Sequence, residues 1–541
     1  MSNGEIIIAP LPFSGHTFPA TVLATQLASR NYQITLLLPS LPSSPLHPLI
    51  RTLQCSAAPP GPPPTHTGQL PFGPADSGPH QGPSTNDILA QLIDNHETSS
   101  PPLLCVIVDV MASQLIQVCT ERGVPAASLF TSSACVTALE HTAIHSQETD
   151  IGPDGLFIVP GLPEEMALTT FNISCVSPPM QMPGLEGPGP MFGTFPPTSM
   201  PPMPPPGGGP HARPPPLPGH GLGTGPYAPL PPPPRQGPSG GPPPPPLAMG
   251  LGQTDDAIAL LINTCSDLEL PFLDYIAKEA KKPVLAVGPL LPSQFWSSVT
   301  GSTSVIHDES IRPKHDSTHS EHDVLNWLDS RPSRSVVYVS FGSTNTPSDV
   351  ELVELAAGLE QSNWAFIWSI QSSAMKHDPA GLPIDQEEPS LFDPDDFAKR
   401  VGDRGLVIRG WAPQLLILSH ESTGGFLTHC GWNSTVEALG CGMPMLTWPI
   451  HGDQIYNARL VTKWLKVGHV LKSEGQGAIK REQVLQGIPK LMTDDEIRQR
   501  VKATSKDVFG KGFPSSSADA VDNFLDLVDA KRRKCQVKLL C

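Results

Sequence analysis

The chain has 541 residues, which is enough for two domains and a large hydrophobic core. Its formal net charge of −17 argues against nucleic acid as a partner. The ten cysteines are scattered and form no C-x-x-C pair, which is typical of proteins from a reducing compartment. No basic signal-peptide region opens the sequence and no apolar stretch is long enough to span a membrane, so we expect a cytoplasmic protein.

The first forty residues predict the start of a doubly wound α/β domain. Continuous apolar runs predict buried strands at 5–9 and 33–38, and helical spacing predicts a helix over 19–29, with Pro19 in its first turn. The loop after the first strand places His16 at the carboxyl end of that strand, where ligands bind in such sheets. From the residues alone, His16 is either an inert loop histidine or part of a site.

Two further strands bring polar residues to the same edge. The run 103–108 predicts a buried strand that ends in Asp109, and the run 126–130 predicts another that is followed by Thr131. An aspartate at such a strand end is common in active sites, and helix capping is the equal alternative. Because adjacent parallel strands end at one edge, Asp109 and His16 can meet although they lie far apart in sequence.

A proline-rich segment interrupts the chain at about 178–248. Residues 178–246 contain 29 prolines in 69 positions, so the segment cannot bury enough apolar surface to offset its ordering entropy. We expect disorder or polyproline II there, and an exposed Pro/Gly-rich loop at 55–85. The segment is either a tolerated surface insertion or a docking site for a proline-recognition domain such as SH3, WW or profilin.

A second α/β unit is predicted after a linker. Strands at 336–341 and 365–369, with a helix at 349–360 between them, repeat the α/β winding. Histidines of the linker 291–321 match no metal-ligand spacing. The triplet Asp393-Pro394-Asp395 spells a DxD metal motif, but we interpret it as the cap of the following helix, and we predict no metal site.

Residues 411–454 are rich in chemically useful side chains and contain no Lys or Arg. A strand at 425–427 leads through a glycine turn into a helix, with Asn433 or Ser434 as its N-cap. Backbone N–H groups and the positive dipole end at that point form an anion site that suits a phosphate. Trp411 offers a face on which a base could stack, worth roughly 1–3 kcal/mol.

The same stretch offers hydrogen-bonding groups for a sugar nucleotide. Gln414 and Glu437 suit ribose hydroxyls, although Ser434 and Glu437 also fit a capping box, and the two roles can coexist. Asp453 and Gln454, expected in a loop, suit the hydroxyls of a sugar. By contrast, we interpret His420 as structural.

This stretch resembles the signature box of plant secondary-product UDP-glycosyltransferases. The similarity rests on WAPQ at 411–414, HCGWNS at 429–434, Glu437, Gly442, Pro444, Pro449 and the terminal Asp453-Gln454, all in the family's spacing. Further segments resemble family segments elsewhere: PLPFSGH (10–16), CVIVDVMA (105–112), FTSSA (130–134), SFGST (340–344) and FIWSI (366–370).

The resemblance implies a GT-B fold, an α/β architecture of two doubly wound Rossmann-like domains facing a central cleft. The implied parts are an acceptor-binding domain (1–290), a linker (291–321), a UDP-sugar-binding domain (322–530) and a basic tail (531–541). In the family, helices and loops at the position of the proline-rich segment form one wall of the acceptor pocket.

The resemblance also implies the site residues. His16 is the catalytic base, and Asp109 orients it. Trp411 and Ala412 would bind uracil, Gln414 and Glu437 the ribose, His429, Asn433 and Ser434 the diphosphate, and Thr131, Trp432, Asp453 and Gln454 the sugar. The donor-binding residues so implied are Gly15, Thr131, Ser343, Ser369, Trp411, Ala412, Gln414, His429, Trp432, Asn433, Ser434, Glu437, Asp453 and Gln454.

The implied reaction is inverting transfer of a hexose from a UDP-sugar to a hydroxyl of a small lipophilic acceptor, with no metal or other cofactor. A terminal Gln in the box goes with glucose in this family, so UDP-glucose is the expected co-substrate. His451 is shared with zeatin O-glycosyltransferases, and flavonoids or other phenolics fit as well, so the acceptor stays open. A catalytically impaired transferase that serves as a proline-rich scaffold is the alternative.

Overall fold

The computed structural model describes residues 2–39, 46–55, 84–98, 101–176, 251–300, 306, 317–371, 375–376, 390–473 and 475–540. The predictions for the proline-rich segment 178–248, for most of the loop 55–85 and for much of the linker concern residues outside the described ranges. Among the described helices, none combines the length and the apolar character that crossing a membrane requires.

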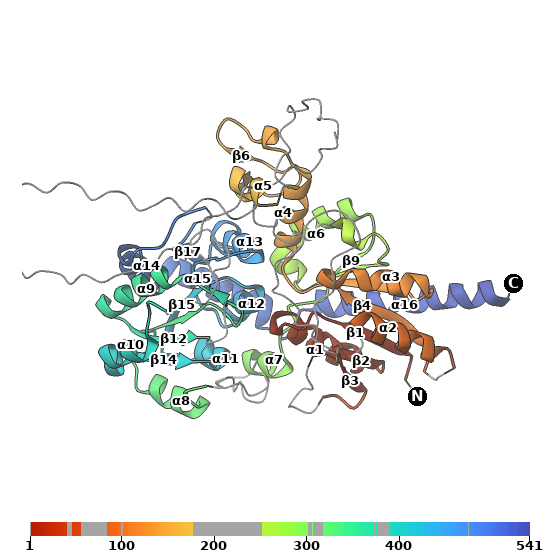
Figure 1. Cartoon of the computed structure of the whole chain (residues 1–541), viewed down its shortest axis with the longest axis horizontal. Coiled ribbons are helices and arrows are strands. Elements are labelled where there is room, and N and C mark those ends of the chain that lie inside the picture. The colour runs from red at the N-terminus through yellow and green to blue at the C-terminus, as the bar shows by residue number, and fades with distance from the viewer. Residues whose placement is uncertain are drawn as a thin grey trace, which may run out of the picture. The chain divides into compact units, whose positions relative to one another are not determined.

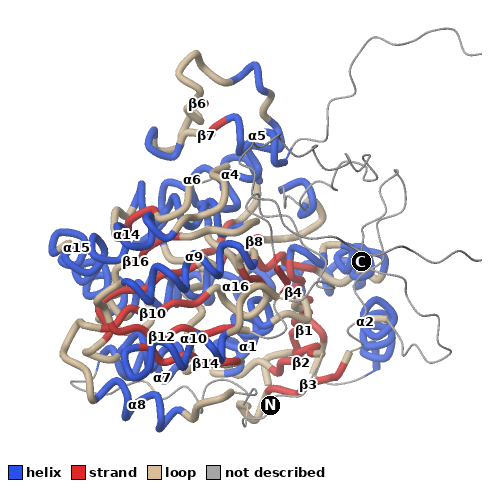
Figure 2. Tube along the Cα trace, turned by 60° about the vertical axis from the view of Figure 1, so that its left-hand side comes forward, coloured by secondary structure: helices blue, strands red, loops and turns tan. Residues whose placement is uncertain are grey.

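In the described part of the chain, seven parallel strands form an N-terminal sheet: β1 (Glu5–Ala9), β2 (Gln33–Leu38), β3 (Ile50–Gln54), β4 (Leu103–Asp109), β5 (Ala126–Phe130), β8 (Leu260–Ile262) and β9 (Val284–Ala286). Their order in space is β3-β2-β1-β4-β5-β8-β9. Figures 1 and 2 show the part β3-β2-β1-β4 of this order. Since β1 pairs with β4 and β4 with β5, the segments that follow these three strands lie at one edge of the sheet.

The elements that accompany this sheet are α1 (Ser14–Ala28), α2 (Thr85–Asp94), α3 (Gln114–Glu121), α4 (Ala134–His145), the short strands β6 (Leu156–Phe157) and β7 (Leu168–Thr169), α5 (Thr170–Val176) and α6 (Ser266–Ala280). Helix α1 begins before Pro19, so His16 lies in its first turn and not in a loop, which corrects the prediction. Pro19 is tolerated inside the helix because the carbonyl of Gly15, which loses its partner there, accepts a hydrogen bond from Asn433 Nδ2 at 3.2 Å.

Six parallel strands form the C-terminal sheet among the described residues after 317: β10 (Val336–Ser340), β12 (Ala365–Ile370), β14 (Gly405–Arg409), β15 (Thr423–Thr428), β16 (Met445–Thr447) and β17 (Gly468–Val470). Their order is β14-β12-β10-β15-β16-β17. A small parallel pair is formed by β11 (Asn345–Thr346) and β13 (Met375–Lys376).

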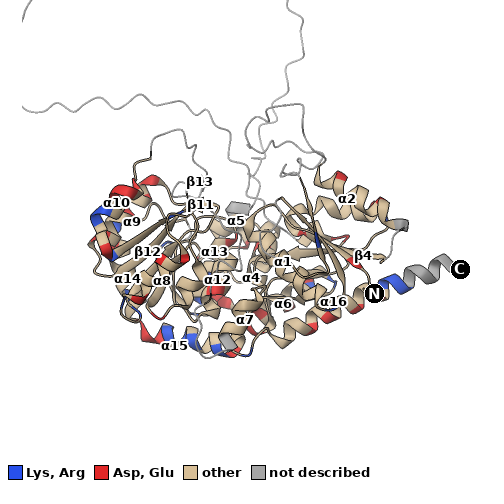
Figure 3. Ribbon diagram, turned by 90° about the horizontal axis from the view of Figure 1, so that it is seen from below, with Lys and Arg blue, Asp and Glu red and all other residues tan. Residues whose placement is uncertain are grey.

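The α-helices that follow residue 290 among the described residues are α7 (Ser293–Thr300), α8 (Glu321–Asp329), α9 (Asp349–Gln361), α10 (Pro394–Val401), α11 (Gln414–Ser419), α12 (Trp432–Gly440), α13 (Asp453–Arg459), α14 (Arg481–Thr493), α15 (Asp495–Thr504) and α16 (Ser515–Leu540). Helix α7 lies within the stretch that we expected to be linker. Helix α16 continues to Leu540, through most of the expected basic tail. Figure 3 shows Lys and Arg on outer helices such as α15 and α16, whereas α12 contains neither.

Two expectations for the signature stretch are wrong in detail. Helix α12 begins at Trp432 with Gly431 as its N-cap, so neither Asn433 nor Ser434 caps it and no capping box with Glu437 forms. Asp453 and Gln454 do not lie in a loop but in the first turn of α13. The positive end of the helix dipole there favours a negative charge on Asp453.

Both sheets are buried on both faces, as parallel sheets require. Successive residues of β1 illustrate this, since Ile7 contributes to one hydrophobic cluster and Ile6 and Ile8 to another. The second of these clusters includes Val521 and Phe524 of α16, so the last helix packs on the N-terminal sheet. The residues before 179 and after 244 form one compact unit.

Candidate active site

His16 and Asp109 form a hydrogen-bonded pair at the edge of the N-terminal sheet. His16 Nδ1 lies 2.7 Å from Asp109 Oδ2, and the Asp109 side chain is fully buried. The other oxygen, Oδ1, accepts the backbone N–H of Met111 at 3.0 Å. The carboxylate is therefore fixed on both sides, and it favours the tautomer with hydrogen on Nδ1. That tautomer leaves Nε2 of His16 with its lone pair.

The electrostatics of this pair determine the protonation of His16. Burial lowers the pKa of the imidazole, but the charge and hydrogen bond of Asp109, with a contribution from Asp453, outweigh burial and raise the pKa above its ordinary value. The ring keeps 19% of its side-chain surface exposed. A reacting group can therefore reach an imidazole whose partner stabilises the protonated form.

A three-residue turn between β5 and α4 joins this pair to the C-terminal half. The hydroxyl of Thr131 lies 3.0 Å from His16 Nδ1. Ser132 Oγ donates to Asp453 Oδ2 at 3.0 Å, and Ser133 Oγ donates to Asn457 Oδ1 at 2.8 Å. Thr131 was expected to contact a sugar, and here its hydroxyl contacts the histidine. We did not foresee Ser132 or Asn457, although Ser132 stands inside the FTSSA segment beside Thr131.

Asp453 and Gln454 are held by contacts of their own. Asn457 Nδ2 donates to Asp453 Oδ2 at 3.0 Å, and burial raises the pKa of Asp453, against the hydrogen bond from Ser132 and the charge of His16. The Gln454 side-chain oxygen accepts the backbone N–H groups of Ile450 (2.9 Å) and His451 (3.3 Å). These contacts order the loop that ends the signature stretch and bring Asp453 into the electrostatic field of His16.

The buried amide of Gln414 links α11 to α12. Gln414 Nε2 donates to Ser434 Oγ at 3.0 Å and to Glu437 Oε2 at 2.7 Å. All three side chains are buried, and Glu437 is fully inaccessible. Ala412, two residues before Gln414, is also buried, whereas Trp411 is partly exposed. The structure therefore brings together the expected uracil and ribose residues.

The remaining expected donor residues lie near the ends of strands or beside α1. Ser369 at the end of β12 donates to the carbonyl of Gly410 at 3.3 Å. Ser343 Oγ lies 2.9 Å from Ser14 Oγ of α1, a contact that the sequence did not reveal. The indole of Trp432 donates to the carbonyl of Asn263 at 2.6 Å, so its N–H is engaged by backbone and not directed at a sugar.

His429 fills a space that two glycines leave open. Burial, and next the nearby His451, lower the pKa of His429 to about 4, so the ring is neutral near pH 7. Nδ1 of the ring is buried and has no hydrogen-bond partner among the described residues. A Cβ on Gly431 would lie 2.5 Å from His429 Nε2, and one on Gly342 would lie 2.7 Å from it. The chain then turns through Cys430 (φ 65°) into the N-terminus of α12.

We expect Gly342→Ala to weaken UDP binding by about tenfold, or ~1.4 kcal/mol, because the new methyl group pushes His429 aside. Gly342 also has φ +79°, which costs an alanine about 1–2 kcal/mol of stability. Gly402→Ala is the matched control, since Gly402 has φ +55° but no atom within 4 Å of its Cβ position. Calorimetric UDP titration of both variants separates the two effects. Equal UDP affinity in both would contradict the steric role.

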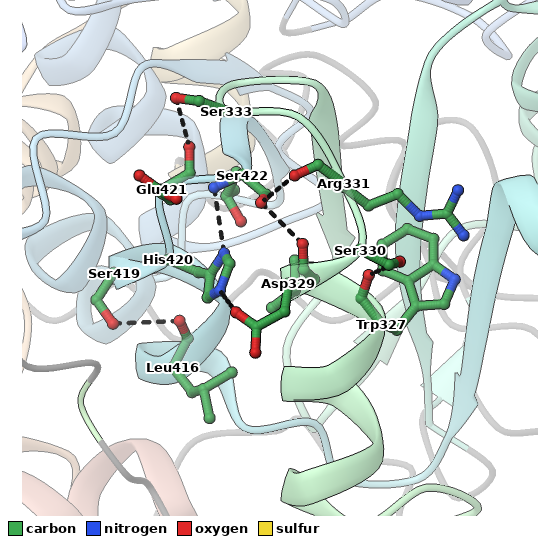
Figure 4. A network of polar contacts seen from close by, with 12 residues as sticks. Trp327, Asp329, Ser330, Arg331, Ser333, Leu416, Ser419, His420, Glu421 and Ser422 are labelled. Carbon is green, nitrogen blue, oxygen red and sulfur yellow. Dashed lines mark hydrogen bonds and ion pairs between the residues drawn. The ribbon is translucent and has the colours of Figure 1, made fainter.

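Two alternatives that the sequence left open are settled by contacts. Figure 4 shows His420 between Asp329 and Ser422: Nδ1 accepts the N–H of Ser422 at 3.1 Å, so Nε2 carries the hydrogen and donates to Asp329 at 3.1 Å. This confirms a structural role. Asp393 caps α10 by accepting the N–H groups of Asp395 and Asp396, as predicted. Within the described ranges, no group of three or more His, Cys, Asp or Glu could hold a metal ion.

Two parallel α/β sheets, with a His–Asp pair at the edge of one and a helix N-terminus at the edge of the other, define a GT-B glycosyltransferase fold. Solved structures confirm this fold. A Glycyrrhiza uralensis transferase complexed with glycyrrhetinic acid 3-O-monoglucuronide has a TM-score of 0.64 and 20% identity, covering 99% of this chain and 98% of that one. A Medicago truncatula transferase complexed with UDP-glucose has a TM-score of 0.61 and 22% identity, and the match covers 97% of this chain and 98% of that one.

Residues 304–505 match the model of the family described as UDP-glucoronosyl and UDP-glucosyl transferase. It is 35% identical over 284 residues to a UDP-glucose flavonoid 3-O-glucosyltransferase of Fragaria ananassa (50% of this chain, 53% of that protein). It is 37% identical over 252 residues to the scopoletin glucosyltransferase of Nicotiana tabacum (45% and 48%). It is 38% identical over 246 residues to the zeatin O-glucosyltransferase of Phaseolus lunatus (44% and 49%). The chain thus spans about half the length of these curated relatives.

Proposed function

We propose that the protein transfers a hexose, preferentially glucose, from a UDP-sugar to a hydroxyl of a small lipophilic acceptor with inversion at the anomeric carbon. The observation that carries this proposal is the His16–Asp109 pair at 2.7 Å. His16 lies on α1, and the carbonyl of the preceding Gly15 accepts a hydrogen bond from Asn433 at the start of α12. This hydrogen bond joins the residue next to the proposed base to Asn433, which we predict binds the diphosphate.

In the proposed reaction, His16 Nε2 removes the proton of the acceptor hydroxyl. The hydroxyl oxygen attacks the anomeric carbon, the bond from that carbon to the diphosphate oxygen breaks, and UDP leaves with the electron pair. Asp109 stabilises the imidazolium that forms, as in other His–Asp couples. Backbone N–H groups and the dipole at the N-terminus of α12, together with His429, would stabilise the charge on the departing UDP.

For the donor, we propose that Trp411 and Ala412 hold the uracil, and that Gln414 and Glu437 hold the ribose. The diphosphate would lie against His429, Asn433 and Ser434. The sugar would then lie near Thr131, Trp432, Asp453 and Gln454, and its hydroxyls would compete with Ser132 for Asp453. Gly15, Ser343 and Ser369 complete the proposed site. No metal or other cofactor is required in this scheme.

We expect Gln454→His to lower the preference for UDP-glucose over UDP-galactose by about tenfold, or ~1.4 kcal/mol. The Gln454 side chain orders the loop before α13 through hydrogen bonds to the backbone N–H groups of Ile450 and His451, and an imidazole cannot reproduce both. The measurement is a competition between the two donors with products separated by mass. Gln483→His is the control, because Gln483 also accepts a backbone N–H, from Lys480, but at the exposed start of α14. An unchanged donor ratio would rule out this assignment.

The proposal is tested by mass-spectrometric detection of products. Purified protein is incubated with UDP-glucose and a panel of phenols, flavonols, coumarins and cytokinins, with and without EDTA. A hexose adduct that forms in the presence of EDTA supports transfer without a metal and names an acceptor. An adduct only without EDTA would exclude the metal-free mechanism. UDP binding with no adduct on any acceptor would favour the scaffold alternative.

Two further parts of the proposal rest on sequence. We place the acceptor-binding domain at 1–290 and the UDP-sugar-binding domain at 322–530. A cytoplasmic location and a proline-recognition partner stay predictions from composition. Removal of residues 178–246 separates a tolerated insertion, whose loss leaves turnover intact, from a scaffold segment, whose loss removes the binding of its partners.

A further inference from the structure

One buried carboxylate beside the site has no part in the proposed chemistry. Glu269 of α6 is 0% exposed, and no Lys, Arg or His of the described residues forms an ion pair with it. The helix is distorted at this residue, with φ −138° and ψ 26°, two positions before Pro271. Because a buried carboxylate without a counterion is costly, the hydrogen bonds that it accepts must account for its presence.

Those hydrogen bonds lead to the first turn of α4. Glu269 Oε2 accepts the backbone N–H of Ala134 at 3.1 Å, and Oε1 accepts that of Cys135 at 2.8 Å. The third N–H, of Val136, is bonded to Ser133 Oγ at 3.1 Å. The free N–H groups of this helix start are therefore satisfied largely by a side chain from another helix, which the helix dipole favours.

The start of α4 is also where the active-site turn ends. The three preceding residues contact His16, Asp453 and Asn457 through their hydroxyls, at 3.0, 3.0 and 2.8 Å. A displacement of the helix start would move all three hydroxyls together. By holding the start of α4, Glu269 fixes the position of the turn 131–133, which lies between the proposed base and the proposed sugar site.

The kink of α6 is packed against the C-terminal half as well. The indole of Trp464, in the π-helical turn Leu460–Trp464 after α13, donates to the carbonyl of Leu268 at 3.2 Å. Its ring meets Phe272 edge-on, with centroids 5.9 Å apart. Glu269 therefore lies between α4 and the segment that follows Asp453 and Asn457.

We propose that Glu269 is a positioning residue for the transfer reaction, which holds the turn 131–133 in register with His16 and Asp453. The inference rests on the proposed function. The proposed role of Glu269 concerns the reacting geometry and not nucleotide affinity, because the residues proposed to bind uridine lie just before α11, on α11 and on α12. Misplacement of a reacting group by about 1 Å can cost about 10²-fold in rate.

We expect Glu269→Gln to lower kcat by about 10- to 100-fold while the Kd for UDP changes by less than about threefold. The glutamine oxygen can accept one of the two N–H groups, and its own NH₂ group then faces the other. Hydrogen exchange of the backbone N–H groups of 134–136 should become faster. Glu269→Asp, which keeps a carboxyl group on a shorter side chain, should recover part of both losses.

Glu351→Gln is the matched control. Glu351 is also buried, accepts the N–H of Ile479 at 3.3 Å and pairs with Lys472 at 2.9 Å, but it lies on α9 of the C-terminal half. The Glu351→Gln substitution should lower the unfolding temperature without changing kcat or the hydrogen exchange of the backbone N–H groups of 134–136. A folded Glu269→Gln protein with wild-type kcat and exchange would overturn the proposal, as would an equal loss of kcat in Glu351→Gln.

The two readouts separate this inference from the proposed function. If the wild-type protein glucosylates no acceptor, exchange of 134–136 in UDP-bound protein still reports on the turn, and unchanged exchange in Glu269→Gln would overturn the inference. If Glu269→Gln does not fold, kcat and hydrogen exchange are measured on Glu269→Asp instead. We then expect a partial loss of kcat and partly faster exchange of 134–136. Wild-type values of both would contradict the role.

Discussion

Replacement of His16 by Ala is expected to lower kcat for hydroxyl acceptors by about 10²- to 10⁴-fold, the contribution of a positioned general base. The alanine variant lacks the Nε2 atom that we propose takes the acceptor proton, and no other described imidazole is bonded to Asp109. UDP affinity should be unchanged, since the proposed uridine residues do not contact His16. Product formation at saturating donor and acceptor, with calorimetric UDP titration, is the measurement.

The chain offers a matched control for this variant. His469 on β17 forms a comparable pair with Asp494, with 3.0 Å between Nε2 and Oδ2, and its side chain is 13% exposed. His469→Ala removes a His–Asp pair far from the proposed chemistry, so it should retain wild-type kcat. Full activity of His16→Ala would remove His16 from the mechanism. Equal losses in both variants would indicate a general effect of losing such a pair.

The sequence predicted the strands at the site better than the helix ends. Continuous apolar runs identified β1, β2, β4 and β5, because strands buried on both faces carry few polar interruptions. The start of α1 was missed because Pro19 resembles a helix-opening proline. Its actual tolerance depends on the bond from Asn433 to Gly15, a contact between residues 418 positions apart.

Contacts between residues far apart in the sequence also limited the prediction of the site. His16, Asp109 and the signature stretch could be predicted as site residues because the family resemblance assigns roles to specific residue types at fixed spacing. Ser132, Asn457 and Glu269 have no such local signal, since their importance arises from packing α4, α6 and α13 together. Glu269 in particular is, in the sequence, one of two acidic residues shortly before Pro271, the other being Asp267.

Replacement of Asp109 by Asn is expected to lower kcat by about 10³- to 10⁴-fold, although the side chain keeps its shape. Asp109 Oδ1 accepts the Met111 N–H and Oδ2 accepts His16 Nδ1–H, so both oxygens act as acceptors. If the amide oxygen stays on Met111, the amide NH₂ faces Nδ1 and favours the tautomer with hydrogen on Nε2. That tautomer cannot accept a proton from the acceptor hydroxyl.

The pH dependence of the residual activity checks this cause. Burial lowers the pKa of His16 and the Asp109 charge raises it to a net value above the ordinary one. The base is active only when neutral, so activity in the wild type should rise with pH through that raised pKa. In Asp109→Asn the effect of burial remains, and only the smaller contribution of Asp453 opposes it. The acidic limb of kcat/KM should therefore move to lower pH while the plateau falls.

Asp494→Asn provides the corresponding control, because it changes the carboxylate of the His469 pair outside the site. Its pH profile for kcat/KM should match the wild type. An acidic limb in Asp109→Asn that stays at the wild-type pH would show that the Asp109 charge does not set the titration of the base. A plateau that does not fall would show that the tautomer of His16 is fixed by another group, of which Thr131, 3.0 Å from Nδ1, is the nearest candidate.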